Sequence, residues 1–150
     1  MKKIFVLISL SITVYFGDCQ TLNSDSCIKN LVKLQNSINE RNTDKHLIDQ
    51  FWTCYEDRLE NNVELSEFRN EVLFALLEHH TAITLLSLNA QNEHLVCNVL
   101  ADIEYPVNDL INLYKIYYLV NITRDKEIKY KELIMSKLEH AIEKGRIITD

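Results

Sequence analysis

Apolar residues recur every three or four positions along most of the chain, and this spacing predicts amphipathic helices. In residues 64–79, for example, Leu65, Phe68 and Val72 fall on one side of a helix with about 3.6 residues per turn. Each such stretch has one apolar face to bury against a neighbour. We expect six main helices and one short helix, at residues 26–39, 44–60, 64–79, 82–88, 93–104, 107–122 and 127–144.

The residues between these stretches are types that begin and end helices. Asn92 and Thr81 are placed to cap helix starts, and Pro106 is placed to begin a helix, where its missing N–H costs nothing. Gly145 is placed to end the last helix. The chain has two glycines and one proline, whereas a β protein needs many tight turns. The sequence therefore predicts an all-α fold of antiparallel helix pairs, either a short HEAT-like α-solenoid or an irregular helical bundle.

The N-terminus has the composition of a secretory signal. Lys2 and Lys3 precede a run of uncharged, mostly apolar residues, 4–16. A membrane-spanning helix needs roughly 20 such residues, whereas this shorter run fits the apolar region of a signal peptide. We expect an exported protein, periplasmic or extracellular, with no stable membrane insertion after the signal is removed. A retained membrane anchor is the alternative.

Cleavage is expected after Cys19. This position puts Gly17 and Cys19 at the two sites before the cut where signal peptidases require small residues. Residues 1–19 are then the signal peptide, and residues 20–150 form a single helical domain. In the alternative, Cys19 is the lipid-bearing first residue of a bacterial lipoprotein, although Asp18 precedes it where a small residue is usual.

Three cysteines remain after that cleavage, at positions 27, 54 and 97. In an oxidising compartment one pair can form a disulfide. Cys27 and Cys54 lie near the apolar faces of two consecutive predicted helices, and we expect them to pair. The alternative is that all three cysteines are buried free thiols, which act as small apolar residues.

The chain is acidic, with a formal net charge of −6 at pH 7. We therefore expect no binding to nucleic acid by bulk attraction. An acidic surface suits a basic protein partner, because opposite charges guide the two molecules together. There is no glycine-rich phosphate loop, no GxSxG and no CxxC, so no cofactor is predicted.

Glu78, His79 and His80 interrupt an otherwise apolar run. Adjacent residues of a helix point about 100° apart, so one helix cannot direct both imidazoles at one metal ion. No two histidines have the spacing of four that is found in HExxH. We interpret the segment as the end of one helix and the start of the next, and we predict no metal site and no catalytic residue in it.

Asp102, Glu104 and Asp109 lie around a predicted helix–helix corner. Such residues usually cap helices and face water, but they are also candidates for a binding surface. Tyr114 and Tyr118 share one side of the following predicted helix, where tyrosines either pack in the core or contact a partner. These five residues are the candidate interaction surface.

Asn121 begins an Asn-Ile-Thr sequon and is a candidate glycosylation site if the host is a eukaryote. For the whole chain, we expect an exported small helical protein that binds another protein, as an adaptor or as an inhibitor or immunity-type module, without chemistry of its own. One alternative is a carrier of a small apolar ligand in a pocket between helices, for example near Trp52. Another is a hydrolase that uses the carboxylates between Asp102 and Asp109.

Processing of the N-terminus tests the predicted compartment. When the full chain is expressed in its own host, the recovered protein should begin near Gln20, because signal peptidase removes residues 1–19. N-terminal sequencing measures this directly. An intact Met1 on a cytosolic protein would contradict export, whereas a lipid on Cys19 would support the lipoprotein alternative.

Overall fold

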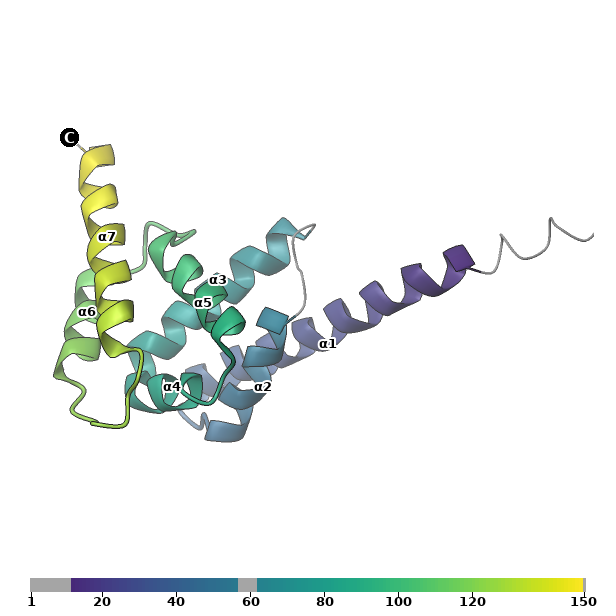
Figure 1. The fold of residues 1–150 in the computed structure, drawn as a ribbon, viewed down its shortest axis with the longest axis horizontal. Helices are drawn as coiled ribbons and strands as arrows, with labels where there is room; N and C mark the ends of the chain where they lie inside the picture. Colours follow the sequence, from purple (N-terminus) through teal and green to yellow (C-terminus); the bar gives the residue numbers. More distant parts are fainter. Residues whose placement is uncertain (1–11, 57–61, 150) are drawn as a thin grey trace, which may run out of the picture.

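The computed structural model describes the backbone of residues 12–56 and 62–149, and the side chains of residues 25–55 and 62–145. Within these ranges every regular element is a helix, and the all-α prediction of six main helices and one short one is confirmed. The helices are α1 (Ile12–Glu40), α2 (Lys45–Glu56), α3 (Val63–His79), α4 (Thr81–Leu88), α5 (Glu93–Glu104), α6 (Leu113–Ile122) and α7 (Lys131–Thr149) (Figure 1).

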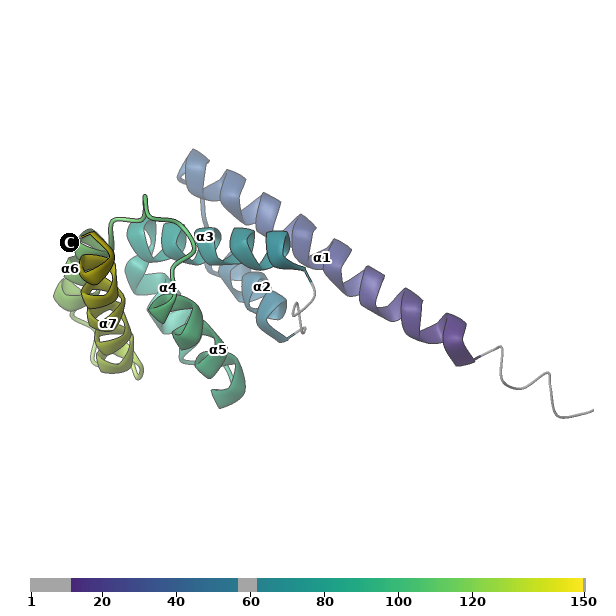
Figure 2. The same ribbon diagram turned by 90° about the horizontal axis from the view of Figure 1, so that it is seen from above.

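Helix α3 is at the centre of the bundle (Figures 1 and 2). It packs against α1, α4, α5 and α6, while α7 packs against α5 and α6 at one end of the molecule. The N-terminal part of α1 projects beyond the other helices in both views. Helices distant in the chain also touch, such as α2 with α5 and α3 with α6, whereas each repeat of a solenoid contacts only its neighbours. The irregular bundle is therefore the architecture observed.

Trp52 lies inside the core where α2 meets α4. Its indole Nε1 donates a hydrogen bond to Ser87 Oγ at 2.8 Å, and that hydroxyl donates to Asp49 Oδ1 at 2.5 Å. Phe51 and Tyr55 pack around the indole, with ring centroids 4.9 and 6.0 Å from it. A buried tryptophan needs an acceptor for its N–H. Ser87 supplies that acceptor and so fixes the short helix α4 against α2.

The predicted cysteine pair joins α1 to α2. Cys27 and Cys54 are both buried, their Cα atoms are 5.2 Å apart, and their sulfur atoms lie within disulfide distance. Cys97 is free and exposed on α5. The two cysteines that are predicted to pair therefore lie at disulfide distance.

Asparagine side chains begin α3, α5 and α6. Asn92 accepts a hydrogen bond from the backbone N–H of Leu95 at 2.9 Å, as predicted, and α5 has the predicted bounds. Asn62 and Asn112 accept from the N–H three residues later in α3 and α6. Each side chain satisfies one of the N–H groups that a first helical turn leaves without a partner.

Helix α1 ends at a residue with a left-handed backbone. Arg41 has a φ of 60°. The N–H of Asn42 donates to the Ser37 carbonyl at 3.0 Å and that of Arg41 donates to the Ile38 carbonyl at 3.1 Å, which are the two bonds of a Schellman motif. Glycine usually occupies this position because it has no Cβ to crowd the left-handed backbone. No glycine marks this end in the sequence.

Pro106 does not begin a helix, and the prediction of one helix over residues 107–122 is wrong in its first turns. Helix α5 ends at Glu104, and α6 begins only at Leu113. Between them, residues 105–112 form an irregular segment, which we call the 105–112 segment.

Asparagine side chains explain why the 105–112 segment is not helical. The N–H of Val107 donates to Asn70 Oδ1 at 3.2 Å, and the N–H of Leu110 donates to Asn108 Oδ1 at 2.9 Å. Such side-chain acceptors compete with helix formation. Asn112 then supplies the N-cap that starts α6.

Other helix ends also differ from the predicted bounds. The helix predicted at 26–39 begins at Ile12, so the backbone is helical well before residue 26. Thr81 does not cap α4 but is its first residue, and its hydroxyl donates back to the Leu77 carbonyl at 2.7 Å. The last helix, predicted at 127–144, begins later and ends later, as α7. Gly145 therefore lies within α7, and no glycine of the described residues has a positive φ. A helical glycine costs only about 1 kcal/mol relative to alanine, so the residues after it can continue the helix.

Parts of two predictions fall outside the described residues. Residues 1–11 of the predicted signal peptide and the side chain of Cys19 lie outside them, while residues 12–19 are the helical start of α1. The end of the helix predicted at 44–60 also lies outside, and its described part forms α2.

Replacing both bridged cysteines, as Cys27→Ser with Cys54→Ser, should lower the free energy of unfolding by roughly 3 kcal/mol. A crosslink that closes a loop of this length restricts the unfolded chain, and its loss removes that restriction. Urea denaturation of the oxidised protein measures the change. Cys97→Ser is the matched control and should change stability by less than about 0.5 kcal/mol, because Cys97 is exposed. Equal effects of the two changes would contradict the pairing.

Candidate functional site

Asp102, the first residue of the candidate interaction surface, is mostly buried and holds three helices together. Its Oδ2 accepts a hydrogen bond from the Tyr55 hydroxyl at 2.9 Å and from the Arg69 guanidinium at 3.1 Å. The guanidinium also lies 4.1 Å from the centroid of the Tyr55 ring and donates to the Cys54 carbonyl at 3.2 Å. Burial and the nearby Asp102 carboxylate raise the pKa of Tyr55 well above its usual value, so the phenol keeps its proton. Asp102 therefore joins α5 to α2 and α3.

Asn70 extends this arrangement to the 105–112 segment. It is buried on α3, and its Nδ2 donates to the Asp102 carbonyl at 2.9 Å while its Oδ1 accepts from the N–H of Val107. A buried amide needs partners for both of its ends, and these two bonds supply them. Asn70 is not among the residues that the sequence predicts to matter. The signal for it in the sequence is a polar residue among the regularly spaced apolar residues of α3.

Glu104 ties α5 to α7. Its carboxylate lies 2.6 Å from Lys137 Nζ, 2.6 Å from His140 Nδ1 and 3.5 Å from Lys144 Nζ. The hydrogen bond from Lys137, with a smaller one from His140, outweighs desolvation and lowers the pKa of Glu104 to about 2. Two of the three predicted surface carboxylates, Asp102 and Glu104, thus have structural partners, while Asp109 is exposed in the 105–112 segment.

His79 and His80 stand where α3 turns into α4, as the sequence predicts. The two helices are bent by 119° at this junction. His80 Nε2 is buried without a hydrogen-bond partner in the described part of the chain. Burial, and to a lesser degree the neighbouring His79, lower the pKa of His80, so its imidazole is neutral at pH 7.

Across residues 25–55 and 62–145, no three His, Cys, Asp or Glu side chains are grouped so that they could hold a metal ion. No single described helix combines the length and the apolar composition needed to cross a membrane. Only α3 and α4 taken together reach that threshold, and they are the sharply bent pair.

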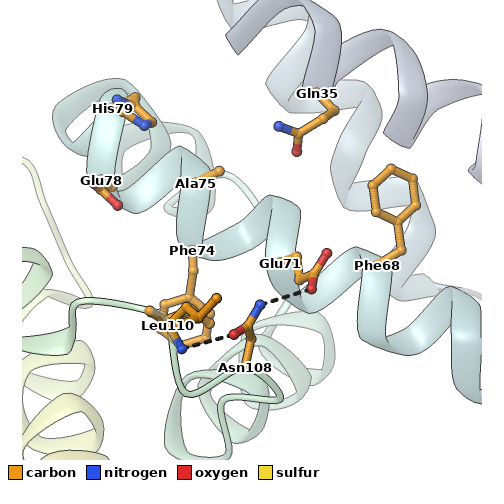
Figure 3. Close-up of a pocket in the computed structure, with 10 residues that line it drawn as sticks. Gln35, Phe68, Glu71, Phe74, Ala75, Glu78, His79, Asn108 and Leu110 are labelled. Carbon is orange, nitrogen blue, oxygen red and sulfur yellow. Dashed lines mark hydrogen bonds between the residues drawn. The ribbon is translucent and has the colours of Figure 1, made fainter. Parts of the chain in front are cut away.

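An open groove of about 430 Å³ runs along the outer side of α3 (Figure 3). Helix α1 and the 105–112 segment form its two walls. Asn108 of that segment donates to Glu71 of α3 at 3.2 Å, and Lys115 of α6 lies 2.6 Å from Glu78. The lining residues are Gln35, Phe68, Glu71, Phe74, Ala75, Glu78, His79, Asn108, Leu110 and Ile111.

A stripe of exposed apolar residues continues from the groove along α6. We call it the α6 stripe; it consists of Leu110, Tyr114, Tyr118 and Ile122, spaced four residues apart. Leu110 is 90% exposed, and the other three are each about half exposed. Each step of four residues turns a helix by about 40° beyond one full turn, so Tyr114, Tyr118 and Ile122 lie within about 80° of one another around α6. The buried residues of this helix, Ile116 and Val120, lie on the opposite side. The predicted surface residues Tyr114 and Tyr118 are therefore accessible.

Tyr117, which lies beside the α6 stripe, has a structural role. Tyr117 is half-buried, and its hydroxyl donates to Glu139 of α7 at 2.7 Å.

Asn121, the sequon residue, is exposed in the last turn of α6. Trp52, near which the carrier alternative places an apolar ligand pocket, lies in the core and does not line the groove.

No protein-family model, curated protein or solved structure matches this chain. Its function must therefore be inferred from its own surface and chemistry.

Acidification should weaken the attachment of α5 to α7. The folded pKa of Glu104 is about 2, below its ordinary value of 4.5, so its contribution to stability is present above that ordinary value and is lost as the pH falls toward 2. Glu104→Gln should be less stable at neutral pH and should lose less stability across this window. Thermal melting at a series of pH values measures both effects. Glu143→Gln, which changes an exposed carboxylate of α7, should keep the wild-type profile; identical profiles for all three proteins would disprove the role of Glu104.

Proposed function

We propose that the chain is an exported, disulfide-stabilised helical module that works by binding another protein. The observation that carries this proposal is the α6 stripe. Tyr114, Tyr118 and Ile122 are exposed on one face of α6, and the exposed Leu110 lies in the segment that leads into this helix. Exposed apolar residues that lie together often mark sites of protein contact, and tyrosine is common in such sites because its ring buries while its hydroxyl keeps a hydrogen bond.

The partners of the carboxylates favour binding over hydrolysis. A hydrolase of the kind considered needs two carboxyl groups directed at one bond. Asp102 is engaged with Tyr55 and Arg69, whereas Glu104 is engaged with α7. The two residues are two positions apart on α5, so their side chains point about 160° apart. They serve the fold on opposite sides of one helix.

The lining of the groove favours a polypeptide over a small apolar ligand. Glu71 and Glu78 carry charge into it, and Asn108 adds an amide. Pockets for small ligands are mostly apolar and enclose most of the ligand. An open groove with charged edges instead suits a partner that brings both apolar and charged side chains.

The disulfide between Cys27 and Cys54 is compatible with export, because disulfides persist in oxidising compartments. It also fixes α1, which forms one wall of the groove, to α2. A binding module benefits from such rigidity, since a surface that is already ordered loses less entropy when it binds. An inhibitor or immunity-type protein and an adaptor would both use a surface of this kind.

Affinity capture from the exported fraction of the host tests the proposal. The wild-type protein should retain a specific partner, and Tyr118→Ser with Ile122→Ser should lose it, because the double change removes the exposed apolar area of α6. Leu133→Ser is the matched control, since Leu133 is about equally exposed on α7. If no captured protein distinguishes the double variant from the wild type and the control, the α6 stripe is not a binding surface.

A further inference from the structure

We propose that the groove binds a basic amphipathic helix of the partner protein. In this arrangement apolar side chains of the helix seat on Phe68, Ala75 and Leu110, and its lysines or arginines face the glutamates of α3. The inference rests on the proposed function, because it names the kind of segment that the partner presents. It concerns the groove, whereas the proposed function is tested on the α6 stripe.

Four glutamates share one side of α3. Glu64, Glu67, Glu71 and Glu78 are three, four and seven residues apart, which places them within an arc of about 60° around the helix. The first three are exposed and Glu78 is half-buried. Phe68 and Ala75 begin about 20° beyond this arc, on the side of α3 toward α1. The exposed side of α3 is therefore an acidic row beside an apolar row.

Among the residues whose side chains are described, the basic ones near the groove leave most of this charge unbalanced. Lys115 pairs with Glu78 at 2.6 Å. Glu71 accepts a hydrogen bond from the neutral amide of Asn108, which does not balance the charge of its carboxylate. On α1, Lys29 and Lys33 are exposed, but they point about 120° and 160° away from Gln35, which faces the groove. A basic partner is the one whose charge complements the groove.

The apolar part of the groove has the dimensions of a short helix. From Phe68 to His79 the floor extends roughly 16 Å, which equals about three helical turns. Leu110 and Ile111 form one apolar wall. On the opposite wall, Ile28 and Val32 are exposed on the same side of α1 as Gln35, so they lengthen the apolar surface. A helix docks in such a groove through apolar residues three, four and seven positions apart.

The charge of the chain disfavours two other occupants. A second copy carries the same net charge of −6, and two of its lysines, Lys137 and Lys144, already contact Glu104. An anionic membrane surface would meet the glutamates of α3 with like charge. A basic helix of another protein has neither disadvantage.

A designed peptide serves as the probe. It has about fourteen residues, with leucine at positions one, four, five and eight and lysine on both flanks, and its matched control replaces every lysine with glutamate. We expect the lysine peptide to bind the oxidised full chain saturably in fluorescence anisotropy, and the glutamate peptide not to bind. NMR shift changes should map to α3 and the 105–112 segment. Failure of the lysine peptide to bind, or equal binding of both peptides, would overturn the proposal.

Charge and apolar variants locate the site. Glu64→Gln with Glu67→Gln should lower the affinity for the lysine peptide roughly fivefold at low salt, because two exposed charge pairs are lost. The affinity of this variant should also depend less on the salt concentration. Leu110→Ser should also weaken binding. Glu132→Gln with Glu143→Gln removes the same charge from exposed positions on α7 and should leave the affinity unchanged. Circular dichroism confirms that each variant is folded.

The remaining outcomes each decide one point. If the α3 and α7 charge variants lower the peptide affinity equally, binding reflects general electrostatic attraction and the proposal that the groove is the site is overturned. Sedimentation that finds a dimer of the wild-type chain, and a monomer after Leu110→Ser, would assign the groove to a second copy and also overturn it. If Tyr118→Ser with Ile122→Ser captures the same proteins as the wild type while the lysine peptide still binds, the proposed function is rejected and the groove is not.

Discussion

The ion pair between Arg69 and Asp102 is the interaction on which the rest of the structure depends. It is largely buried and joins α3 to α5, and through the Tyr55 hydroxyl and ring it also includes α2. A charge in such a place is tolerated only when it is paired and hydrogen-bonded, so each of these three side chains requires the other two. Asn70, one residue after Arg69, carries the same network into the 105–112 segment. The position of the groove wall thus follows from a polar cluster in the core.

Much of the fold could be predicted from the sequence because it depends on local signals. The three-and-four spacing of apolar residues located every helix, and Asn92 marked the start of α5 correctly. The errors arose where a distant partner decides the local structure. Pro106 has the conformation for a helix start, but Asn70 of another helix takes the N–H of the next residue. Spacing alone cannot show that contact.

The candidate site could be predicted only in part, for a related reason. Tyr114 and Tyr118 were identified because their spacing puts them on one side of a helix, and they are exposed. Asp102 and Glu104 were predicted by the same kind of argument, yet both have partners on other helices. Asp102 pairs with Arg69 of α3, and Glu104 pairs with Lys137 of α7. The glutamates of α3 were not singled out, although their spacing was visible in the sequence. Their importance depends on the groove, which forms between segments far apart in the chain.

The two walls of the groove are attached in different ways, and this determines how the groove can change shape. One wall, the 105–112 segment, is bonded to α3 itself through Asn70 and Glu71, so it moves together with the floor. The other wall is α1, which is crosslinked through Cys27 to α2. A change in width would require α1 to shift against α3, with which it packs directly. Leu31 and Leu34 lie between the crosslink and Gln35 and are fully buried, so core packing holds this wall as well and the width of the groove is set before a partner arrives.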